Sequence, residues 1–226
     1  MRRATDWCGS MPADKTIPLG FRDEHVAVGD HIAYLWETPA QFQEGVRFLE
    51  LGLAADDFCV IFGHDAANQR VRDILTADGF NALRMESEGR LAVLQGHSDA
   101  AQMLASIAAV FAGATTRGVP LIRLLGNIGW GRAGWPDEAA IFEFEAQVTG
   151  AAKQFPCVVV CMYDVRALPG HIMAHGAYET HPLTVCRNLL RENPHYVEVD
   201  EYLKRLREID PEPLAYQRDQ PASRNR

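Results

Sequence analysis

Short apolar runs alternate along this chain with longer stretches in which apolar residues recur every three or four positions. The runs are typical of strands covered on both faces, and the recurring pattern is typical of helices that lay one face on a sheet. The runs predict strands over 31–36, 58–62, 91–94, 120–125, 157–162 and 183–186. Such alternation favours an α/β fold of three layers, with a mostly parallel sheet flanked by helices.

Residues that start and stop helices fit the stretches between these strands. Thr38 is a suitable N-cap, Pro39 fits a first helical position, and Gln41 completes a capping box. Asp65 can cap the next helix, and Gly79 is typical of its end. Further helices are expected over 99–117 and 137–153, a short one before residue 180, and a polar one around 202–206.

A single domain is expected over residues 21–209. Residues 1–20 are predicted to form a flexible leader, and the Pro-rich, polar residues 210–226 a disordered tail. In sheets of this kind, ligands bind beyond the carboxyl ends of the strands. A site is therefore expected in the segments that follow the strands ending near residues 36, 62, 125 and 162.

Composition and charge exclude several classes of function. The net charge is −8 over 226 residues, which disfavours attraction to nucleic-acid phosphates. No apolar run is long enough for a transmembrane helix, and the start of the chain lacks the apolar segment of a secretory signal. Five cysteines, an odd number, fit reduced thiols. We therefore expect a cytoplasmic protein that contacts neither nucleic acid nor membrane.

Nucleotide hydrolysis is suggested by the order of strands and helices, but the residues argue against it. A working P-loop needs glycines around the phosphates, a lysine, and a Ser or Thr hydroxyl for magnesium. The segment over 37–45 has no lysine, and Pro39 removes one backbone N–H donor. Glu37 and Glu44 place negative charge where phosphate would bind. The segment is predicted not to support ATP hydrolysis.

The cysteines and histidines are predicted to be structural. On a strand, Cys157 and Cys161 would lie about 13 Å apart, too far to bind one ion. We expect buried core thiols, although a cross-strand thiol cluster at Cys161 stays open. The histidine group His171, His175 and His181 is expected to be exposed or capping, and no G-x-S-x-G motif marks a hydrolase. We predict no metal site, no cofactor and no catalytic residue.

The Gly- and Trp-rich loop over 126–136 is the strongest candidate for a ligand site. Asn127, Trp130 and Trp135 crowd the carboxyl end of a predicted strand, and Asp164 ends the neighbouring strand. Apolar walls with a few polar groups describe a small-molecule pocket. The alternative is that both tryptophans only cover the end of the sheet.

An ordered set of segments resembles one known family, the MEDS sensory domains, named for methanogens, methylotrophs and the dichloromethane-dehalogenase regulator. The matching segments are GDHIAYLWET (29–38), FLELGLAADDFCVIFG (48–63), GRLAVLQG (89–96), RLLGNIGW (123–130), FEFEAQV (142–148), CMYDVRALPG (161–170), THPLTV (180–185) and ENPHYV (192–197). The resemblance implies a RecA/KaiC-like fold, related to P-loop NTPases, whose P-loop has degenerated. It also implies signal sensing, with small hydrocarbon-derived compounds as ligands and a DNA-binding regulator or histidine kinase as output.

The resemblance also singles out residues. Positions that match the family motifs are Tyr34, Glu145, Tyr163, Asp164, His181, Pro182 and Tyr196. Asn127 stands where the family often has an acidic residue, which puts identical ligand chemistry in doubt. The predicted ligand-binding set is Tyr34, Trp36, Glu37, Arg123, Asn127, Trp130, Glu145, Tyr163, Asp164 and His181.

Three functions remain open on the sequence. The favoured one is a non-catalytic sensory domain that binds a small organic ligand and regulates a partner, because the ends of the chain are expected to be too short for an output domain. The alternatives are a nucleotide-binding relative of the RecA/KaiC ATPases and a structural interaction protein without a ligand. Self-association is possible by analogy with RecA-like units.

Overall fold

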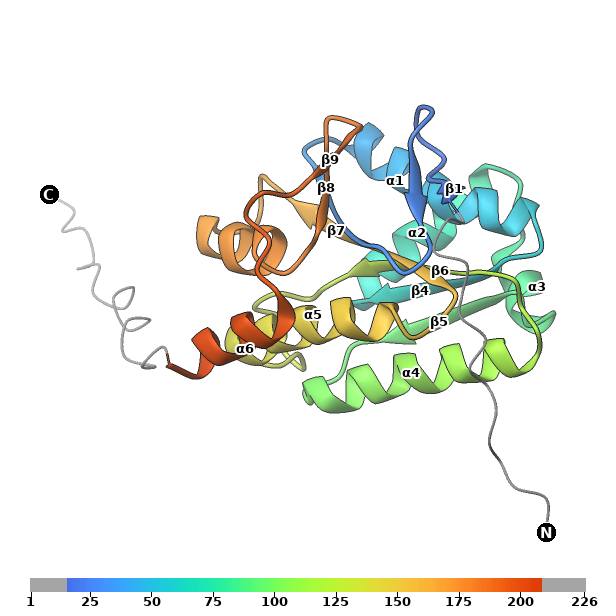
Figure 1. The fold of residues 1–226 in the computed structure, drawn as a ribbon. Coiled ribbons are helices and arrows are strands. Elements are labelled where there is room, and N and C mark those ends of the chain that lie inside the picture. Colours follow the sequence, from blue (N-terminus) through green and yellow to red (C-terminus); the bar gives the residue numbers. More distant parts are fainter. Residues whose placement is uncertain (1–15, 209–226) are drawn as a thin grey trace, which may run out of the picture.

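A seven-stranded sheet lies at the centre of the structure, a computed structural model that describes residues 16–208 (Figure 1). The strand order is β5-β4-β6-β7-β3-β8-β9, and every neighbouring pair is parallel except β8 and β9. The strands are β3 (His31–Trp36), β4 (Phe58–Gly63), β5 (Leu91–Gln95), β6 (Ile122–Asn127), β7 (Cys157–Asp164), β8 (Leu183–Cys186) and β9 (Leu189–Glu192). The predicted, mostly parallel sheet is confirmed.

Helices cover both faces of this sheet, which confirms the predicted three layers (Figure 1). One face carries α1 (Pro39–Ala54), α2 (Asp65–Ala77) and the short α3 (Ala82–Ser87). The other carries α4 (Ala100–Thr116), α5 (Glu138–Ala152) and α6 (Val199–Glu208). Each face has its own hydrophobic core, one built around Phe42 of α1 and one around Phe144 of α5.

The central strand β7 shows how the sequence divides its side chains between the two cores. Val158 and Val160 lie in the core under α1, whereas Val159, Cys161 and Tyr163 lie in the core under α5. Successive side chains of a strand point to opposite faces, so a continuous apolar run is what a doubly covered strand requires. This alternation places the polar atoms of Cys161 and Tyr163 beneath α5.

Side-chain caps set most helix starts. Thr38 accepts from the backbone N–H of Gln41, and the Gln41 side chain returns to the cap, so the predicted capping box is confirmed. The predicted cap of α2 is wrong by one residue, because His64 is the N-cap and Asp65 is the first helical residue. The imidazole of His64 accepts the backbone N–H of Ala67, which is the hydrogen bond that an N-cap side chain makes. Asp65 could make such a bond only as the residue before the helix, and here it is the first residue inside it.

Residues 16–20, predicted to lie in the leader, are part of the folded structure. Strand β1 (Thr16–Pro18) pairs with β2 (His25–Ala27) in a small antiparallel sheet, and the Leu19 side chain is fully buried. The predicted leader over 1–15 and tail over 210–226 lie outside the described residues. Within 16–208, no helix has both the length and the apolarity that crossing a bilayer requires.

Two features were not predicted: the pairing of β8 with a further strand, β9, and the π-helical form of the segment Ile172–Tyr178. Strand β9 has no buried residue, so it carries no apolar run, and it is ordered by pairing with β8. Arg187 and Asn188 form the connecting turn, and both have positive φ, which suits a two-residue hairpin. The short helix predicted before residue 180 corresponds to the π-helix, whose wider backbone spacing has no signature in hydrophobic periodicity.

Candidate functional site

A cavity of about 380 Å³ opens at the carboxyl ends of β3, β6 and β7. Four predicted ligand-binding residues line it: Trp36, Asn127, Trp130 and Asp164. The first turns of α2 and the segment after β7 complete its walls. This is the edge of the sheet where parallel α/β folds place their ligands, because the strand ends and the loops that follow them meet there.

Aromatic side chains and one arginine form the wall of the cavity next to α1. The rings of Trp36 and Phe42 meet edge to face, with centroids 5.1 Å apart. The guanidinium of Arg70, from α2, lies 3.9 Å from the centroid of the Phe42 ring and 5.4 Å from that of Trp36. The guanidinium is planar and always charged, and stacking against aromatic rings fixes the plane of its N–H donors. These donors can bind an anion. This wall suits an organic molecule with an oxygen-bearing end.

Two hydrogen-bond donors in the cavity lining are left without partners among the described residues. They are Nδ2 of Asn127 and Nε1 of Trp130, and both atoms are buried. A buried polar group without a partner costs about 1–3 kcal/mol. Asp164, in contrast, is occupied by the turn that follows β7, since its carboxylate accepts from the backbone N–H groups of Arg166 and Ala167. The buried polar atoms of the lining that lack a partner among the described residues are therefore donors.

Two further groups add charge control to the cavity. Arg132 is exposed and lies at the mouth, in the Trp-rich loop. His64 lines the same wall, and its burial, together with the nearby Arg132 charge, lowers the pKa of its imidazole. Its Nδ1 accepts the Ala67 N–H, so the ring is neutral in this structure. The cavity lining thus carries two arginines, Arg70 and Arg132, and one carboxylate, Asp164.

The turn between β3 and α1 is already filled by its own side chains. The backbone N–H groups of Glu37 and Thr38 both donate to Oε1 of Gln41, at 2.7 and 3.2 Å, and the Gln41 N–H donates to Thr38. These are the groups that a P-loop would turn toward phosphate. Glu37, a predicted ligand-binding residue, takes part here through its backbone, and it does not line the cavity.

Two other predicted residues lie away from the cavity. The Tyr34 hydroxyl donates to the Gln41 carbonyl and lies 2.9 Å from Oδ1 of Asn188, which joins α1 to the β8–β9 turn. Arg123 forms a buried ion pair with Asp57 at 2.8 Å and donates to the carbonyl of Pro18. Arg123 stands near the start of β6, so the strand carries its side chain to the end of the sheet opposite the cavity.

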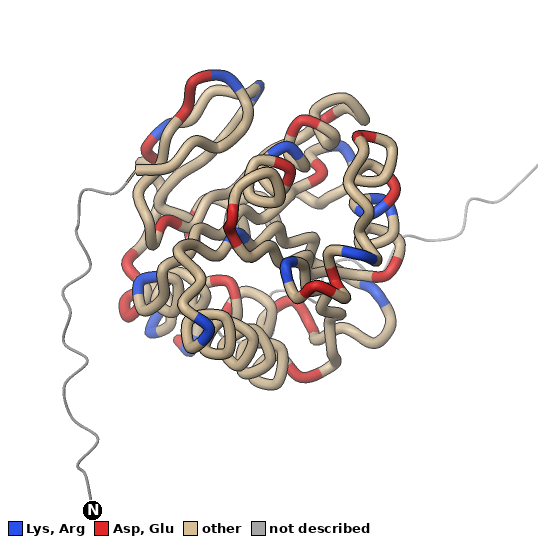
Figure 2. Tube along the Cα trace, turned by 90° about the vertical axis from the view of Figure 1, so that its right-hand side faces the viewer, with Lys and Arg blue, Asp and Glu red and all other residues tan. Residues whose placement is uncertain are grey.

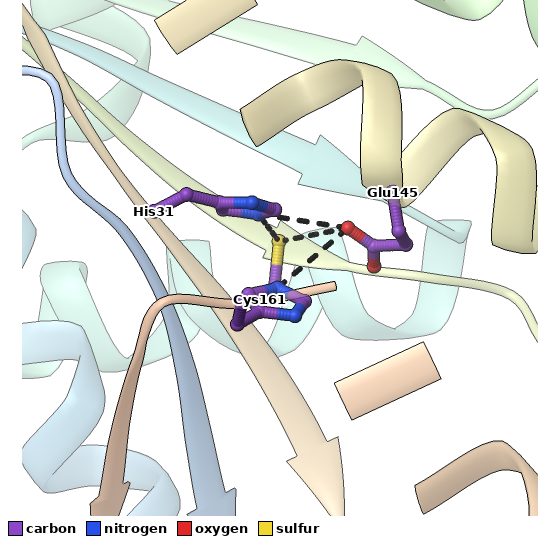
Figure 3. A group of neighbouring side chains, drawn as sticks. His31, Glu145 and Cys161 are labelled. Carbon is purple, nitrogen blue, oxygen red and sulfur yellow. Dashed lines mark hydrogen bonds and ion pairs between the residues drawn. The ribbon is translucent and has the colours of Figure 1, made fainter. Parts of the chain in front are cut away.

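The last three predicted residues, Glu145, Tyr163 and His181, meet inside the protein, beneath α5. Glu145 and His181 belong to a group of buried donor atoms that also includes His31 and Cys161 (Figure 3). The donor atoms of His31, Glu145, Cys161 and His181 all lie within 4.8 Å of one another. The hydroxyl of Tyr163 lies 2.9 Å from Oε1 of Glu145 and 2.9 Å from the carbonyl oxygen of Gly176. Of the described residues, this group is the one that could hold a metal ion.

Burial controls the charge of this group. It raises the pKa of Glu145 to about 7 and lowers the pKa of His181 to about 3. Burial also lowers the pKa of His31, and burial and the neighbouring Glu145 carboxyl raise the pKa of Cys161. Without a bound cation, burial therefore favours the neutral form of each of these side chains.

Sequence reasoning missed His31, Cys161, His64, Arg70 and Phe42 as members of these two sites. His31 and Cys161 were hidden because each begins or interrupts an apolar run that reads as core. Arg70 lies five residues inside a helix, and nothing in its spacing connects it to the strand ends. Glu145 did carry a signal, because an acidic residue stands there between the buried apolar residues Phe144 and Ala146.

Charged residues of both signs are interspersed along the described chain (Figure 2). Lys and Arg do not form a continuous stripe in that view. The local positive charge at the cavity therefore comes from individual arginines.

Three comparisons relate this chain to known proteins. The family model described as "MEDS: MEthanogen/methylotroph, DcmR Sensory domain" matches residues 30–182. The transcriptional repressor DcmR of Methylorubrum extorquens (strain DSM 6343 / CIP 106787 / DM4) is 24% identical over 168 residues, which cover 71% of this chain and 63% of the repressor. The match therefore spans less than two thirds of that relative.

A solved structure shows the same fold. The KaiC-like protein PH0186 from Pyrococcus horikoshii OT3 superposes with a TM-score of 0.55 at 14% identity. The superposition covers 80% of this chain and 89% of the archaeal protein. The likeness confirms the predicted RecA/KaiC-like architecture.

Proposed function

Because this chain belongs to the MEDS family of sensory domains, we propose that it is a non-catalytic sensor that binds a small organic molecule in the cavity at the carboxyl ends of β3, β6 and β7. The proposal is supported above all by the cavity itself, whose volume of about 380 Å³ suits a small ligand. Its place at the strand ends follows the rule for α/β sheets.

The lining indicates the chemistry of the ligand. The rings of Trp36 and Phe42 favour an apolar body, and Arg70 beside them favours an anionic or strongly polar oxygen. Asn127 offers a buried donor that has no partner among residues 16–208. We therefore propose a short organic compound that carries a carboxylate or a comparable acceptor group, held with its acceptor toward these donors.

Competent nucleotide hydrolysis is not favoured. The backbone N–H groups after β3 are bonded to the side chain of Gln41, and the same segment has no lysine. A triphosphate would have to displace the capping box of α1, which contributes about 1 kcal/mol of helix stability. The fold therefore supports the ATPase alternative, but the residues after β3 do not.

We propose that the signal passes to a partner protein, either a transcription regulator or a kinase. The similarity to a transcriptional repressor supports a regulatory role, although it spans only part of that protein. A partner would detect ligand binding through the loops that close the cavity, since these carry both lining residues and exposed positions such as Arg132.

A thermal-shift screen tests the ligand. Short-chain carboxylates, alcohols and haloalkanes are compared with ATP and magnesium on the full chain. A ligand at a hundred times its Kd stabilises by about 2.7 kcal/mol, so a specific compound raises the melting temperature by several degrees. Arg70→Gln should abolish the shift, and Arg47→Gln, an exposed arginine on α1, should keep it. No shift with any organic compound, or tight ATP binding with turnover, contradicts the proposal.

A further inference from the structure

We propose that the buried group beneath α5 is a tetrahedral Zn²⁺ site. Its four ligands are Nε2 of His31, Oε2 of Glu145, Sγ of Cys161 and Nε2 of His181. No single motif marks this site as a whole, because its members come from four separate segments: the start of β3, the middle of α5, β7, and the loop before β8. Since β3 lies between β7 and β8, the fold brings all four to one point.

Four of the six distances between these atoms are close to those of a coordination shell, and all six lie within 4.8 Å. Zinc binds sulfur at about 2.3 Å and nitrogen or oxygen at about 2.0–2.2 Å, so tetrahedral ligands lie about 3.3–3.6 Å from one another. Nε2 of His31 lies 3.3 Å from Sγ of Cys161 and 3.6 Å from Oε2 of Glu145. That carboxylate oxygen lies 3.6 Å from Sγ of Cys161 and 3.7 Å from Nε2 of His181. Both imidazole contacts with Glu145 are longer than a hydrogen bond of about 2.7–3.2 Å.

The hydrogen bonds around His31 turn its lone pair toward the centre. The Thr149 hydroxyl donates its proton to the carbonyl of Thr180 at 2.7 Å. It can therefore only accept from Nδ1 of His31, which lies 2.7 Å away. With the proton on Nδ1, Nε2 of His31 carries a lone pair, and that lone pair faces a thiol and a carboxyl group.

The same logic applies to His181. The Thr180 hydroxyl donates to the carbonyl of Gly176, so it accepts from Nδ1 of His181 at 2.8 Å. Nε2 of His181 is buried and has no hydrogen-bond partner within residues 16–208. Two imidazole lone pairs thus converge on one oxygen of Glu145, an arrangement that is repulsive unless a metal ion or a carboxyl proton lies between them. Metal-binding histidines hold their second nitrogen in this way.

The carboxylate is held from behind as well. The Tyr163 hydroxyl reaches Oε1 of Glu145 at 2.9 Å, which leaves Oε2 for the ion. The charges also balance, because Zn²⁺ with one thiolate, one carboxylate and two neutral imidazoles has no net charge. A neutral assembly is the kind that can be buried fully without a large desolvation penalty.

The donor set selects the metal. Imidazole, thiolate and carboxylate are all ligands of Zn²⁺, which imposes no geometry of its own. Magnesium and calcium prefer oxygen ligands alone, and Cu(II) prefers a square arrangement. Four protein ligands leave no open position, so the ion would hold β3, β7 and α5 together and would not activate water. This inference does not depend on the ligand cavity or on the proposed function.

The competing interpretation is that no metal ion is bound and that the buried side chains carry protons instead. Glu145 and Cys161 would then both be protonated, and the hydrogen bonds among the four side chains would be weak. The two interpretations differ in what the purified protein contains and in what chelation does to it.

Metal analysis of the full chain is the first experiment. We expect about one zinc ion per chain, and removal by a strong chelator should lower the melting temperature, with recovery on addition of Zn²⁺ alone. Co²⁺ added to the metal-free chain should give intense visible bands of a tetrahedral ion and a thiolate-to-cobalt charge-transfer band. A chain that contains no transition metal and takes up neither Zn²⁺ nor Co²⁺ overturns the proposal.

The variant Cys161→Ser assigns the thiolate. It should remove the charge-transfer band and weaken Zn²⁺ binding by more than the roughly 10- to 100-fold that loss of a supporting hydrogen bond costs. The matched control is Cys157→Ser, a buried cysteine on the same strand and the same face that lies outside the group and donates to the Ala152 carbonyl. It should leave both measurements unchanged. Zn²⁺ binding by a folded Cys161→Ser chain at unchanged affinity overturns the assignment.

Two measurements decide the matter if Cys161→Ser does not fold. Zinc-edge X-ray absorption of the unmutated chain should show one sulfur and three nitrogen or oxygen neighbours, and a shell without sulfur overturns the site. Thr149→Val, which removes the acceptor of His31 but no ligand, should weaken Zn²⁺ binding about 10- to 100-fold while the charge-transfer band persists. Unchanged affinity in that variant contradicts the orientation assigned to His31.

Discussion

At the scale of single residues, Arg123 shows how chemistry that looks functional can be structural. Its guanidinium is buried against Asp57 and the carbonyl of Pro18, so it joins β6, the start of β4 and β1. A charged residue in a strand next to a ligand loop suggests binding, but side-chain direction and position along the strand decide which end of the sheet it reaches. Neither can be predicted from a motif.

The variant Asp57→Ala tests this structural role. Removing one partner leaves the other charge buried and unpaired, which costs about 3–5 kcal/mol. We expect a loss of that size in the free energy of unfolding, measured by urea denaturation, with ligand binding retained in the folded fraction. The neighbouring exposed Asp56→Ala should change stability by about 0.5 kcal/mol or less. Similar losses for the two variants would contradict the ion pair.

Gly63 is a residue whose missing side chain shapes the cavity. A Cβ placed there would lie 2.5 Å from the backbone oxygen of Asn127, at the point where β4 and β6 end together. Gly63→Ala should therefore lower the free energy of unfolding by about 1–3 kcal/mol and weaken the ligand, because Asn127 must move. Gly150→Ala, in α5 with open space around it, should instead stabilise by about 0.5–1 kcal/mol. Equal effects in thermal denaturation would contradict the close approach.

At the scale of elements, the sequence was informative wherever an apolar run or a cap defines an element. The limits of β3 and β8 were predicted to the residue, and those of α1, α4 and α5 to within a few residues, because caps such as Thr38 and Asp99 carry short-range chemistry. The hairpin of β1 and β2 and the strand β9 were missed, since tertiary pairing orders them and no periodicity marks them. The cavity loop was found, but its partner wall on α2 could only be seen in three dimensions.

The cap of α2 makes stability depend on pH in a defined direction. His64 accepts the Ala67 N–H while neutral, and its pKa is lowered from the ordinary value of 6.5. The unfolded chain therefore binds the proton first, so this contribution is fully present above about pH 6.5 and is lost as the pH falls below it. His64→Asn keeps a capping acceptor that does not titrate.

We expect the two chains to differ by a constant amount above about pH 6.5. Below it, the free energy of unfolding of the unmutated chain should fall by up to about 1 kcal/mol relative to His64→Asn. The loss should be smaller than for a fully buried cap, because the His64 ring is half-buried. Urea denaturation at several pH values measures the difference. A trend of the opposite sign would show that His64 gains its proton in the folded state.

At the scale of the whole molecule, the cavity and the buried metal group lie on a common path of contacts. The Trp130 ring lines the cavity and lies 5.4 Å from the Phe142 ring and 6.4 Å from that of Tyr163. Tyr163 in turn is hydrogen-bonded to Glu145 and meets the His181 ring edge to face at 5.6 Å. A change that reorients Tyr163 must therefore move Trp130 or open a gap beside it, because packed interiors do not deform freely.

This path predicts that removing the metal alters the environment of Trp130. In a chain with Trp7, Trp36 and Trp135 changed to Phe, chelation should shift and quench the fluorescence of Trp130, and Zn²⁺ should restore it. A chain that keeps only Trp36, whose neighbours are Phe42 and Arg70, should respond much less. Since coupling between two sites is reciprocal, a response of Trp130 also implies that an occupied cavity changes the Zn²⁺ affinity. Zinc loss confirmed by metal analysis, with Trp130 emission unchanged, would show that the two sites are energetically independent.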